Sequence, residues 1–270
     1  MGILRQGKPF SLALALALLP NALVASDSTY GKPQQLQSAA GQLFAMANRT
    51  RAQYGLGSLK WDSSLASGAL QHCIRMTQGS SLSHQYRGEQ DVTARASQAG
   101  AHFSLIEENI AIGPYAASIH QGWMNSPGHR ANLLNPAIDR VGIVVLVRGG
   151  SLYAVADYSR AVPVLNPAQV EASFKTLLRA RGLSVLRDPS AARAWCAASG
   201  RFRPTDGASF LMRWQGADLT ALPSELVRRV ASGEYRQAAV GSCPVQSVHG
   251  GFTAYRVAVL LYGMDAAALP

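Results

Sequence analysis

Apolar residues recur every three or four positions along several stretches of the chain, which is the spacing of one face of an α-helix. The first stretch covers residues 36–54 and ends at Gly55, a residue suited to a helix C-terminus. The second begins after Asp62 or Ser63, either of which can cap a helix, and keeps its apolar positions on one face through Met76. Two amphipathic helices are therefore predicted near the start of the chain.

The same spacing predicts shorter helices over 92–99 and 116–124, with a brief apolar piece at 110–112 between them. Farther along, the apolar run at 141–158 is interrupted by a Gly-Gly pair, which is typical of a tight β-hairpin. Helices that are followed by antiparallel strands favour an α+β layered domain, here over about 36–161.

The remainder of the chain repeats this alternation on a smaller scale. A Val-Pro-Val-Leu-Asn-Pro segment at 162–167 is predicted to be a linker. Beyond it, the pattern predicts two helices and two strands, at 170–181, 188–196, 238–243 and 255–262. We expect a smaller α+β region over 168–264.

The second region faintly echoes the first. Residues 51–62 and 179–188 share the order Arg-Ala, Gly, Leu followed by a basic residue, and Asp. Residues 141–156 and 240–258 share Val-Gly and, later, a Tyr-x-Val-Ala segment. Either the second region is a degenerate repeat of the first, or the two segments are unrelated helix-loop-helix segments whose ordinary composition makes them look alike.

Composition indicates a folded and basic chain. Of the 270 residues, 48% are hydrophobic and 15% charged, which is enough apolar material for a core and argues against disorder. The formal net charge is +10, which favours anionic surfaces by diffuse attraction. Basic runs interleaved with aromatics are absent from the sequence, so specific nucleic-acid binding is not predicted.

Residues 1–26 have the features of an export signal. Arg5 and Lys8 precede a short apolar core at 10–19, and small residues near Ala25 offer a cleavage site. This core is too short to span a bilayer, and the sequence holds no longer apolar run. We therefore expect an exported chain, periplasmic or extracellular, that carries no transmembrane segment after processing.

The three cysteines, Cys73, Cys196 and Cys243, cannot all pair within one chain. Export permits disulfides, and we expect Cys196 to pair with Cys243 because both lie in the C-terminal region. Cys73 falls on the apolar face of a predicted helix and is expected to be a free, buried thiol. The sequence contains no Cys-x-x-Cys pair, so a thiolate zinc site is not predicted.

Three polar residues beside structural breaks could carry chemistry. His84 follows a Ser-rich loop, Glu108 precedes an Asn in an expected turn, and His129 follows Ser-Pro-Gly, where Ser126 is expected to cap the next helix. Two imidazoles and a carboxylate are the minimum of a hydrolytic zinc site. Spacing alone does not bring them together, and each could instead bond local backbone.

Other histidines have structural interpretations. His102 and His120 flank these elements, and His72 is expected to be exposed or half-buried on its helix. Lone histidines of this kind are mostly structural.

The first region resembles the CAP superfamily of cysteine-rich secretory, antigen 5 and pathogenesis-related 1 proteins, also called the SCP domain, in its bacterial form. The resemblance rests on Ser-His at 83–84, Glu-Asn-Ile-Ala at 108–111 and Trp-Met-Asn-Ser-Pro-Gly-His-Arg-Ala-Asn-Leu-Leu at 123–134. Further matches at 48–66 and 141–158 extend it over nearly all of 36–161.

This resemblance implies a three-layer α-β-α sandwich with an antiparallel sheet and a cleft that holds His84, Glu108 and His129. The second glutamate of the family pattern is missing, because Ser126 occupies that neighbourhood. Some members bind zinc or another divalent ion through the two histidines, and others bind sterols or lipids in a separate groove. The resemblance implies no general enzymatic activity.

The function predicted from these observations is that of an exported CAP-type binding protein. Its His/Glu cleft would take a divalent metal ion or small ligand, and its basic surface would contact envelope or extracellular polymers. One alternative is a zinc-dependent hydrolase of peptide or cell-wall substrates, in which His84 and His129 hold zinc and Glu108 is the catalytic base. Another is a lipid or sterol carrier. Binding is favoured because catalytic zinc usually has three protein ligands.

Overall fold

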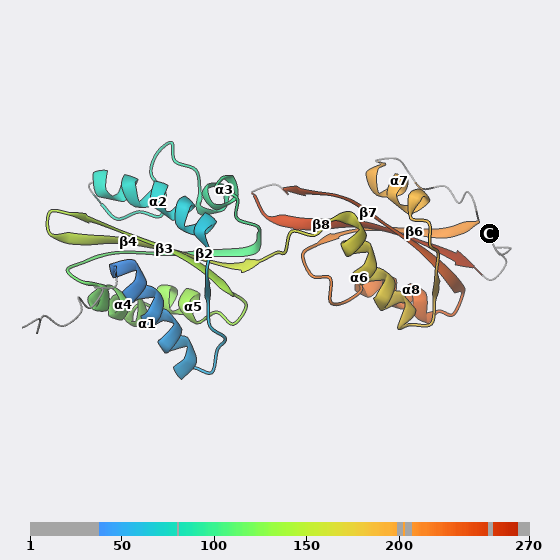
Figure 1. Cartoon of the computed structure of the whole chain (residues 1–270), viewed down its shortest axis with the longest axis horizontal. Coiled ribbons are helices and arrows are strands. Elements are labelled where there is room, and N and C mark those ends of the chain that lie inside the picture. Colours follow the sequence, from blue (N-terminus) through green and yellow to red (C-terminus); the bar gives the residue numbers. More distant parts are fainter. Residues whose placement is uncertain (1–37, 80, 199–201, 203–206, 248–250, 264–270) are drawn as a thin grey trace, which may run out of the picture. The chain divides into compact units, whose positions relative to one another are not determined.

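A computed structural model describes residues 38–79, 81–198, 202, 207–247 and 251–263 (Figure 1). The predicted export signal at 1–26 lies outside the described residues, as does the end of the predicted C-terminal region. The described chain forms two four-stranded sheets, each with helices on both faces. The first sheet and its helices form the N-terminal domain, and the second sheet and its helices form the C-terminal domain.

The N-terminal domain contains five helices and four strands among the described residues. The helices are α1 (Ala39–Gln53), α2 (Ser63–Gln78), α3 (Val92–Gln98), α4 (Ala116–Asn125) and α5 (Pro127–Leu134). The strands are β1 (Lys60–Trp61), β2 (Phe103–Gly113), β3 (Arg140–Arg148) and β4 (Ser151–Ala161). Their order in the sheet is β1-β3-β4-β2, antiparallel except for the parallel pair of β1 and β3.

Helices α2 and α3 cover one face of this sheet, and α1, α4 and α5 cover the other (Figure 1). Strand β4 lies between the layers, and its residues 154–159 are all buried. On one side Leu43, Trp123 and Leu133 pack in a common core, and on the other Cys73 and Met76 pack against the sheet. The predicted α-β-α sandwich is confirmed.

Gly142 of β3 lies directly against the backbone of α2. A Cβ atom at this position would lie 2.1 Å from the Ala66 nitrogen and 2.5 Å from the Leu65 carbonyl carbon of α2. Only a residue without a side chain allows the two backbones to come so close. Asp62 caps α2, as one of the two predicted candidates, and its N–H donates to the Val141 carbonyl (2.9 Å).

The C-terminal domain contains α6 (Pro167–Arg179), α7 (Ser190–Ala197) and α8 (Ser224–Ala231). Its strands are β5 (Ser184–Val185), β6 (Ala208–Gly216), β7 (Tyr235–Ser247) and β8 (Thr253–Gly263). The sheet order is β5-β7-β8-β6, with β5 parallel to β7 and the other pairs antiparallel. Helix α7 covers one face, and α6 and α8 cover the other (Figure 1).

The two domains share local details as well as sheet order. A Cβ atom at Gly241 of β7 would lie 2.1 Å from the Arg193 nitrogen of α7, which matches the contact of Gly142 with α2. Strands β2 and β6 both begin with a register shift against their partners. Glycines with positive φ, Gly55 and Gly182, end the first helix of each domain.

Several elements differ from the sequence prediction. The short apolar piece at 110–112 is part of the eleven-residue strand β2, and the polar segment at 207–231 contains β6 and α8, which the apolar pattern did not indicate. The strands β2 and β6 form because each pairs with a central strand, β4 or β8, and this pairing stabilises segments whose own pattern is weak. Cys196 and Cys243 form the predicted disulfide, and Cys73 is the buried free thiol.

Candidate functional site

The structure brings the three sequence-predicted residues together. His84 lies in the loop between α2 and α3, Glu108 in the middle of β2, and His129 in the first turn of α5. His84 Nδ1 lies 2.8 Å from Glu108 Oε1, and the ring centroids of His84 and His129 are 6.3 Å apart. These side chains come from three separate elements, so the fold rather than local sequence creates their proximity.

Glu108 is held from two sides. Its side chain is almost fully buried, and its Oε2 accepts a hydrogen bond from the Arg95 guanidinium at 2.5 Å. Arg95 belongs to α3 and is itself buried. Glu108 therefore connects α3 to the loop that carries His84. The prediction of a turn at Glu108 is wrong, because β2 continues through Glu108, which pairs in register with Asp157 of β4.

Two asparagines connect β2 to the helix that carries His129. Asn109 Nδ2 donates to the His129 carbonyl (2.9 Å), and Asn132 Nδ2 donates to the Glu108 carbonyl (3.1 Å) and to Asn109 Oδ1 (3.0 Å). Ser126 occupies the N-cap position of α5, as predicted, but its side chain makes no capping hydrogen bond. The orientation of α5 depends on these asparagines and on Pro127 at its first position.

A buried charged network extends behind the site. Glu89 lies between Arg95 (3.7 Å) and His72 Nδ1 (2.8 Å), and the His72 side chain is fully buried. The expectation of an exposed or half-buried His72 is therefore wrong. Arg95 was not among the site residues predicted from the sequence, although the next residue, Ala96, lies on the apolar face of α3. A charged residue that is fully buried must be paired, and only the folded structure reveals the partner.

The two imidazoles have opposite pKa shifts. The hydrogen bond to Glu108 raises the pKa of His84, against the opposing effects of partial burial and of Arg95. Burial lowers the pKa of His129, and the charge of His84 lowers it further. As pH falls, His84 therefore becomes protonated before His129. The side chain of His84 is 57% exposed, so its ring is open to solvent and to ligands.

Asp157 is the second carboxyl group of the site. It lies on β4 opposite Glu108 and is completely buried, and neither of its carboxyl oxygens has a hydrogen-bond partner among the described residues. Burial raises its pKa well above the ordinary value, and the neighbouring charge of Glu108 raises it further. The sequence signal for Asp157 was a single acidic residue within an apolar strand.

Comparison with known proteins identifies the domain that contains His84, Glu108 and His129. Residues 44–158 match the sequence profile of the CAP, or cysteine-rich secretory protein, family. The N-terminal domain is a CAP domain.

Similar proteins include bacterial ones. A Bacillus subtilis (strain 168) protein named uncharacterized membrane protein YlbC is 32% identical over 124 residues, a match that covers 44% of this chain and 34% of YlbC. An extracellular Bacillus anthracis protein with an SCP domain is 30% identical, with 45% of this chain and 40% of that chain covered and a TM-score of 0.42. This chain spans well under two thirds of either protein.

A CAP-fold structure has also been solved with zinc. NaASP2 with Zn²⁺ is 14% identical, with 48% of this chain and 85% of that chain covered and a TM-score of 0.35. In the part of the present chain that the structure describes, no three His, Cys, Asp or Glu side chains gather as a metal-binding group. In the same residues, no helix is long and apolar enough to cross a membrane.

Two imidazoles that bind one tetrahedral ion with metal–nitrogen bonds of about 2.1 Å have ring centroids about 5.3 Å apart. The ring centroids of His84 and His129 are 6.3 Å apart. Both rings can therefore bind one ion only if they move about 1 Å closer together, and the described residues do not provide the third protein ligand of a catalytic zinc site.

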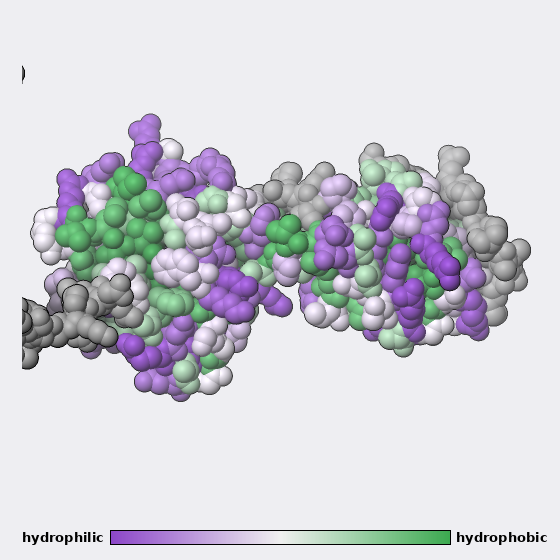
Figure 2. All heavy atoms as spheres, in the orientation of Figure 1, coloured by the Kyte–Doolittle hydropathy of each residue, from purple (hydrophilic) through white to green (hydrophobic). Residues whose placement is uncertain are grey.

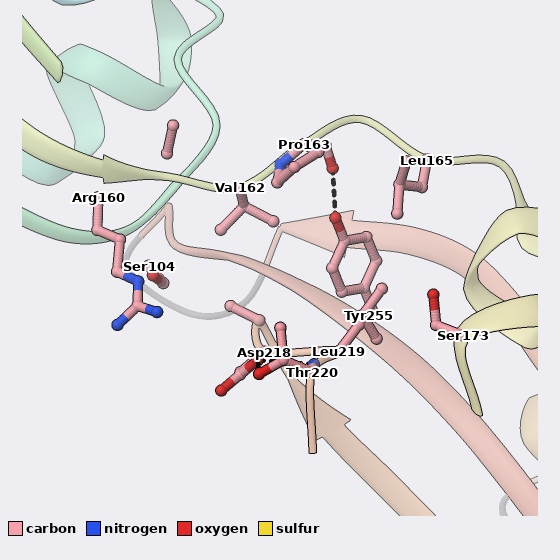
Figure 3. A pocket seen from close by; sticks show the side chains of 12 residues that line it. Ser104, Arg160, Val162, Pro163, Leu165, Ser173, Asp218, Leu219, Thr220 and Tyr255 are labelled. Atoms are coloured by element: carbon pink, nitrogen blue, oxygen red, sulfur yellow. Dashed lines mark hydrogen bonds between the residues drawn. The ribbon is translucent and has the colours of Figure 1, made fainter. Parts of the chain in front are cut away.

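A separate cavity of about 500 Å³ lies beside the segment that follows β4 (Figure 3). Tyr255 points along it and donates a hydrogen bond to the Pro163 carbonyl (2.5 Å). Asp218 and Thr220 line the same cavity, and Thr220 bonds the Asp218 carboxylate through its hydroxyl and its backbone N–H. None of the sequence-predicted site residues lines this cavity.

Proposed function

We propose that this is an exported CAP-domain protein whose His84/His129 cleft binds a divalent ion together with a small or polymeric ligand. The observation that carries this proposal is the hydrogen bond from His84 to Glu108. With Nδ1 occupied, His84 has only Nε2 free for an ion, and Glu108 fixes the direction of its ring. Zinc, when bound, would supply open coordination positions for an anionic group of the ligand.

The role of Glu108 in this proposal is to position His84 rather than to act as a catalytic base. One carboxylate oxygen accepts from His84 and the other from Arg95, and the group is buried. A general base must reach the proton that it removes, directly or through a water molecule. The arrangement therefore favours binding over the alternative of a zinc-dependent hydrolase. A lipid or sterol carrier has no specific support from this cleft.

Export and contact with anionic polymers complete the proposal. The sequence of residues 1–26, the CAP family and the Cys196–Cys243 disulfide are in keeping with an oxidising compartment outside the cytoplasm. The net charge of +10 favours anionic envelope polymers as the long-range partner.

We further propose that the C-terminal domain is a degenerate repeat that has lost this cleft. The support lies in its identical sheet order and in Gly241, the counterpart of Gly142. On this alignment Arg213 corresponds to Glu108 and Ala258 to Asp157, because each pair occupies the same register position. Within 207–247 the chain passes from β6 to β7 through α8 alone, without a counterpart of α5.

The test is zinc titration by calorimetry on the chain beginning at residue 27. We expect one site in the wild type and at least a tenfold loss of affinity in both His84→Ala and His129→Ala. The matched control is His102→Ala, an exposed histidine outside the cleft, which should bind as the wild type does. Equal zinc binding in all four proteins would contradict a shared His84/His129 site. Zinc-dependent cleavage of casein or peptidoglycan that is lost in Glu108→Gln would favour the hydrolase.

A further inference from the structure

The cavity beside the segment that follows β4 has the size of a small-molecule binding site. Its volume is about 500 Å³. Small-molecule pockets have volumes of about 300–1,000 Å³ and combine apolar walls with a few polar groups. Figure 2 shows hydrophobic side chains at the surface where Figure 1 places the segment between β4 and α6, so this part of the chain offers apolar contacts to a ligand from solution.

The apolar wall of the cavity is part of a packed core. Val162 and Tyr255 are buried in one core cluster, and Leu165 and Leu219 pack against the same cluster. The Tyr255 hydroxyl donates to the Pro163 carbonyl, which joins the segment after β4 to strand β8 (Figure 3). A ligand would therefore contact a wall that is already formed, and little affinity would be lost in ordering these side chains.

Two opposite charges lie beside this wall. Arg160, near the end of β4, and Asp218, just after β6, are the only charged residues among the described ones that line the cavity. Figure 3 shows both on the same side of the cavity, away from Ser173. Both residues are exposed, and neither forms an ion pair with the other or with another described residue.

The Asp218 carboxylate is oriented by Thr220 and keeps one oxygen open. Its Oδ1 accepts from the Thr220 N–H (2.8 Å) and from the Thr220 hydroxyl (2.6 Å), whereas its Oδ2 accepts from no described residue. These hydrogen bonds lower the pKa of Asp218, and the charge of Arg160 lowers it further. Asp218 is therefore negatively charged at neutral pH and lies near enough to Arg160 for the two charges to interact.

This pair of charges limits the kind of ligand that the cavity can bind. A ligand with only an anionic group would be attracted by Arg160 and repelled by Asp218, and a ligand with only a cationic group would experience the reverse. A zwitterion satisfies both residues, because its carboxylate can pair with the guanidinium and its ammonium group with the open Oδ2. The apolar wall adds a preference for an apolar side chain.

We propose that this cavity binds a zwitterionic α-amino acid with a large apolar side chain. Its ammonium group donates to Asp218 Oδ2, and its carboxylate accepts from the Arg160 guanidinium. Its side chain contacts Val162, Leu219 and the Tyr255 ring. This site is separate from the histidine cleft and does not depend on the proposed ion binding.

The probe is L-phenylalanine, titrated by calorimetry into the chain beginning at residue 27. We expect saturable binding that weakens at least tenfold in Asp218→Asn and in Arg160→Gln. Both side chains are exposed, so both variants should fold as the wild type does. The matched control is Asp188→Asn, because Ser190 bonds the Asp188 carboxylate through its N–H and its hydroxyl, as Thr220 bonds Asp218, but Asp188 does not line the cavity.

Modified ligands distinguish recognition of a zwitterion from simple contact with an apolar surface. N-acetylphenylalanine lacks the ammonium group, phenylalaninamide lacks the carboxylate, and glycine lacks the apolar side chain. Each should bind at least tenfold more weakly than L-phenylalanine. In methyl NMR spectra, L-phenylalanine should shift the signals of Val162 and Leu219 and leave those of Leu133, in the core of the N-terminal domain, unchanged.

Three results would overturn the proposal. The first is the absence of saturable L-phenylalanine binding up to about 10 mM. The second is a loss of affinity in Asp188→Asn as large as that in Asp218→Asn. The third is binding of N-acetylphenylalanine or phenylalaninamide as tight as that of L-phenylalanine, since one charge would then be sufficient.

Discussion

Replacing Glu108 by glutamine removes the charge that joins His84 to Arg95. Arg95 would then be a buried cation without its 2.5 Å partner. Breaking a buried ion pair from one side typically costs about 3–5 kcal/mol. Arg95 keeps the Gln90 carbonyl at 2.8 Å and Glu89 at 3.7 Å, so we place the cost for Glu108→Gln at the lower end, about 3 kcal/mol.

The measurement is urea unfolding followed by the indole N–H signals in NMR spectra. The Trp123 indole donates to the Ile110 carbonyl in the core of the N-terminal domain and reports on the unfolding of that domain. Trp195 and Trp214 lie in the C-terminal domain and are the internal control, because Glu108→Gln should leave their transition unchanged.

A double-mutant cycle tests the cause of this loss. Arg95→Met combined with Glu108→Gln removes both charges, so the pair of substitutions should cost less than the sum of the two single ones. The reasoning is refuted if the costs simply add, or if Glu108→Gln lowers the free energy of unfolding by less than about 1 kcal/mol.

The same variant should change the titration of His84. Because the hydrogen bond to Glu108 is the main cause that raises its pKa, that pKa should fall in Glu108→Gln. The pKa of His84 is also raised in the folded state relative to the unfolded state. His84 therefore contributes stability that is present below its unfolded pKa and is lost as pH rises through its folded pKa. An NMR titration of the His84 ring protons checks both statements, and an unchanged pKa would show that Glu108 does not control this imidazole.

Two further substitutions test the fold around the site. Gly142→Ala should destabilise the N-terminal domain by about 3 kcal/mol or more, because its Cβ would lie 2.1 Å from the Ala66 nitrogen. Gly122→Ala has open space at its Cβ and should stabilise α4 by up to about 1 kcal/mol. Thermal unfolding of both variants checks this, and equal effects of the two substitutions would refute it. Asp157→Asn should change the pH dependence of stability. Because its pKa is raised in the folded state, Asp157 contributes stability that is present below its unfolded pKa and is lost as pH rises through its folded pKa. The free energy of unfolding of Asp157→Asn, relative to that of the wild type, should therefore rise from about pH 4 toward neutral pH. A constant difference between the two free energies across this range would contradict a protonated buried Asp157.

Several features of this protein followed from sequence alone because their causes are local. The Gly-Gly turn between β3 and β4 needs two residues with positive φ, and Gly149 and Gly150 provide them. Asp62 caps α2 through its own side chain, and the apolar face of α2 includes Cys73. The order of motifs from His84 to 123–134 was enough to predict the CAP fold before any contact was known.

Tertiary structure alone decided what surrounds the histidines. A strand covered by helices on both faces has no alternating pattern, so β2 was predicted only as the apolar piece at 110–112, and Glu108 was assigned to a turn. The ion pair of Arg95 with Glu108 and the hydrogen bond between His72 and Glu89 join residues on different elements. A polar residue that will be buried has the same local sequence signal as one on the surface. Its partner is set by how the layers pack, and this is why the chemistry of the cleft required the folded chain.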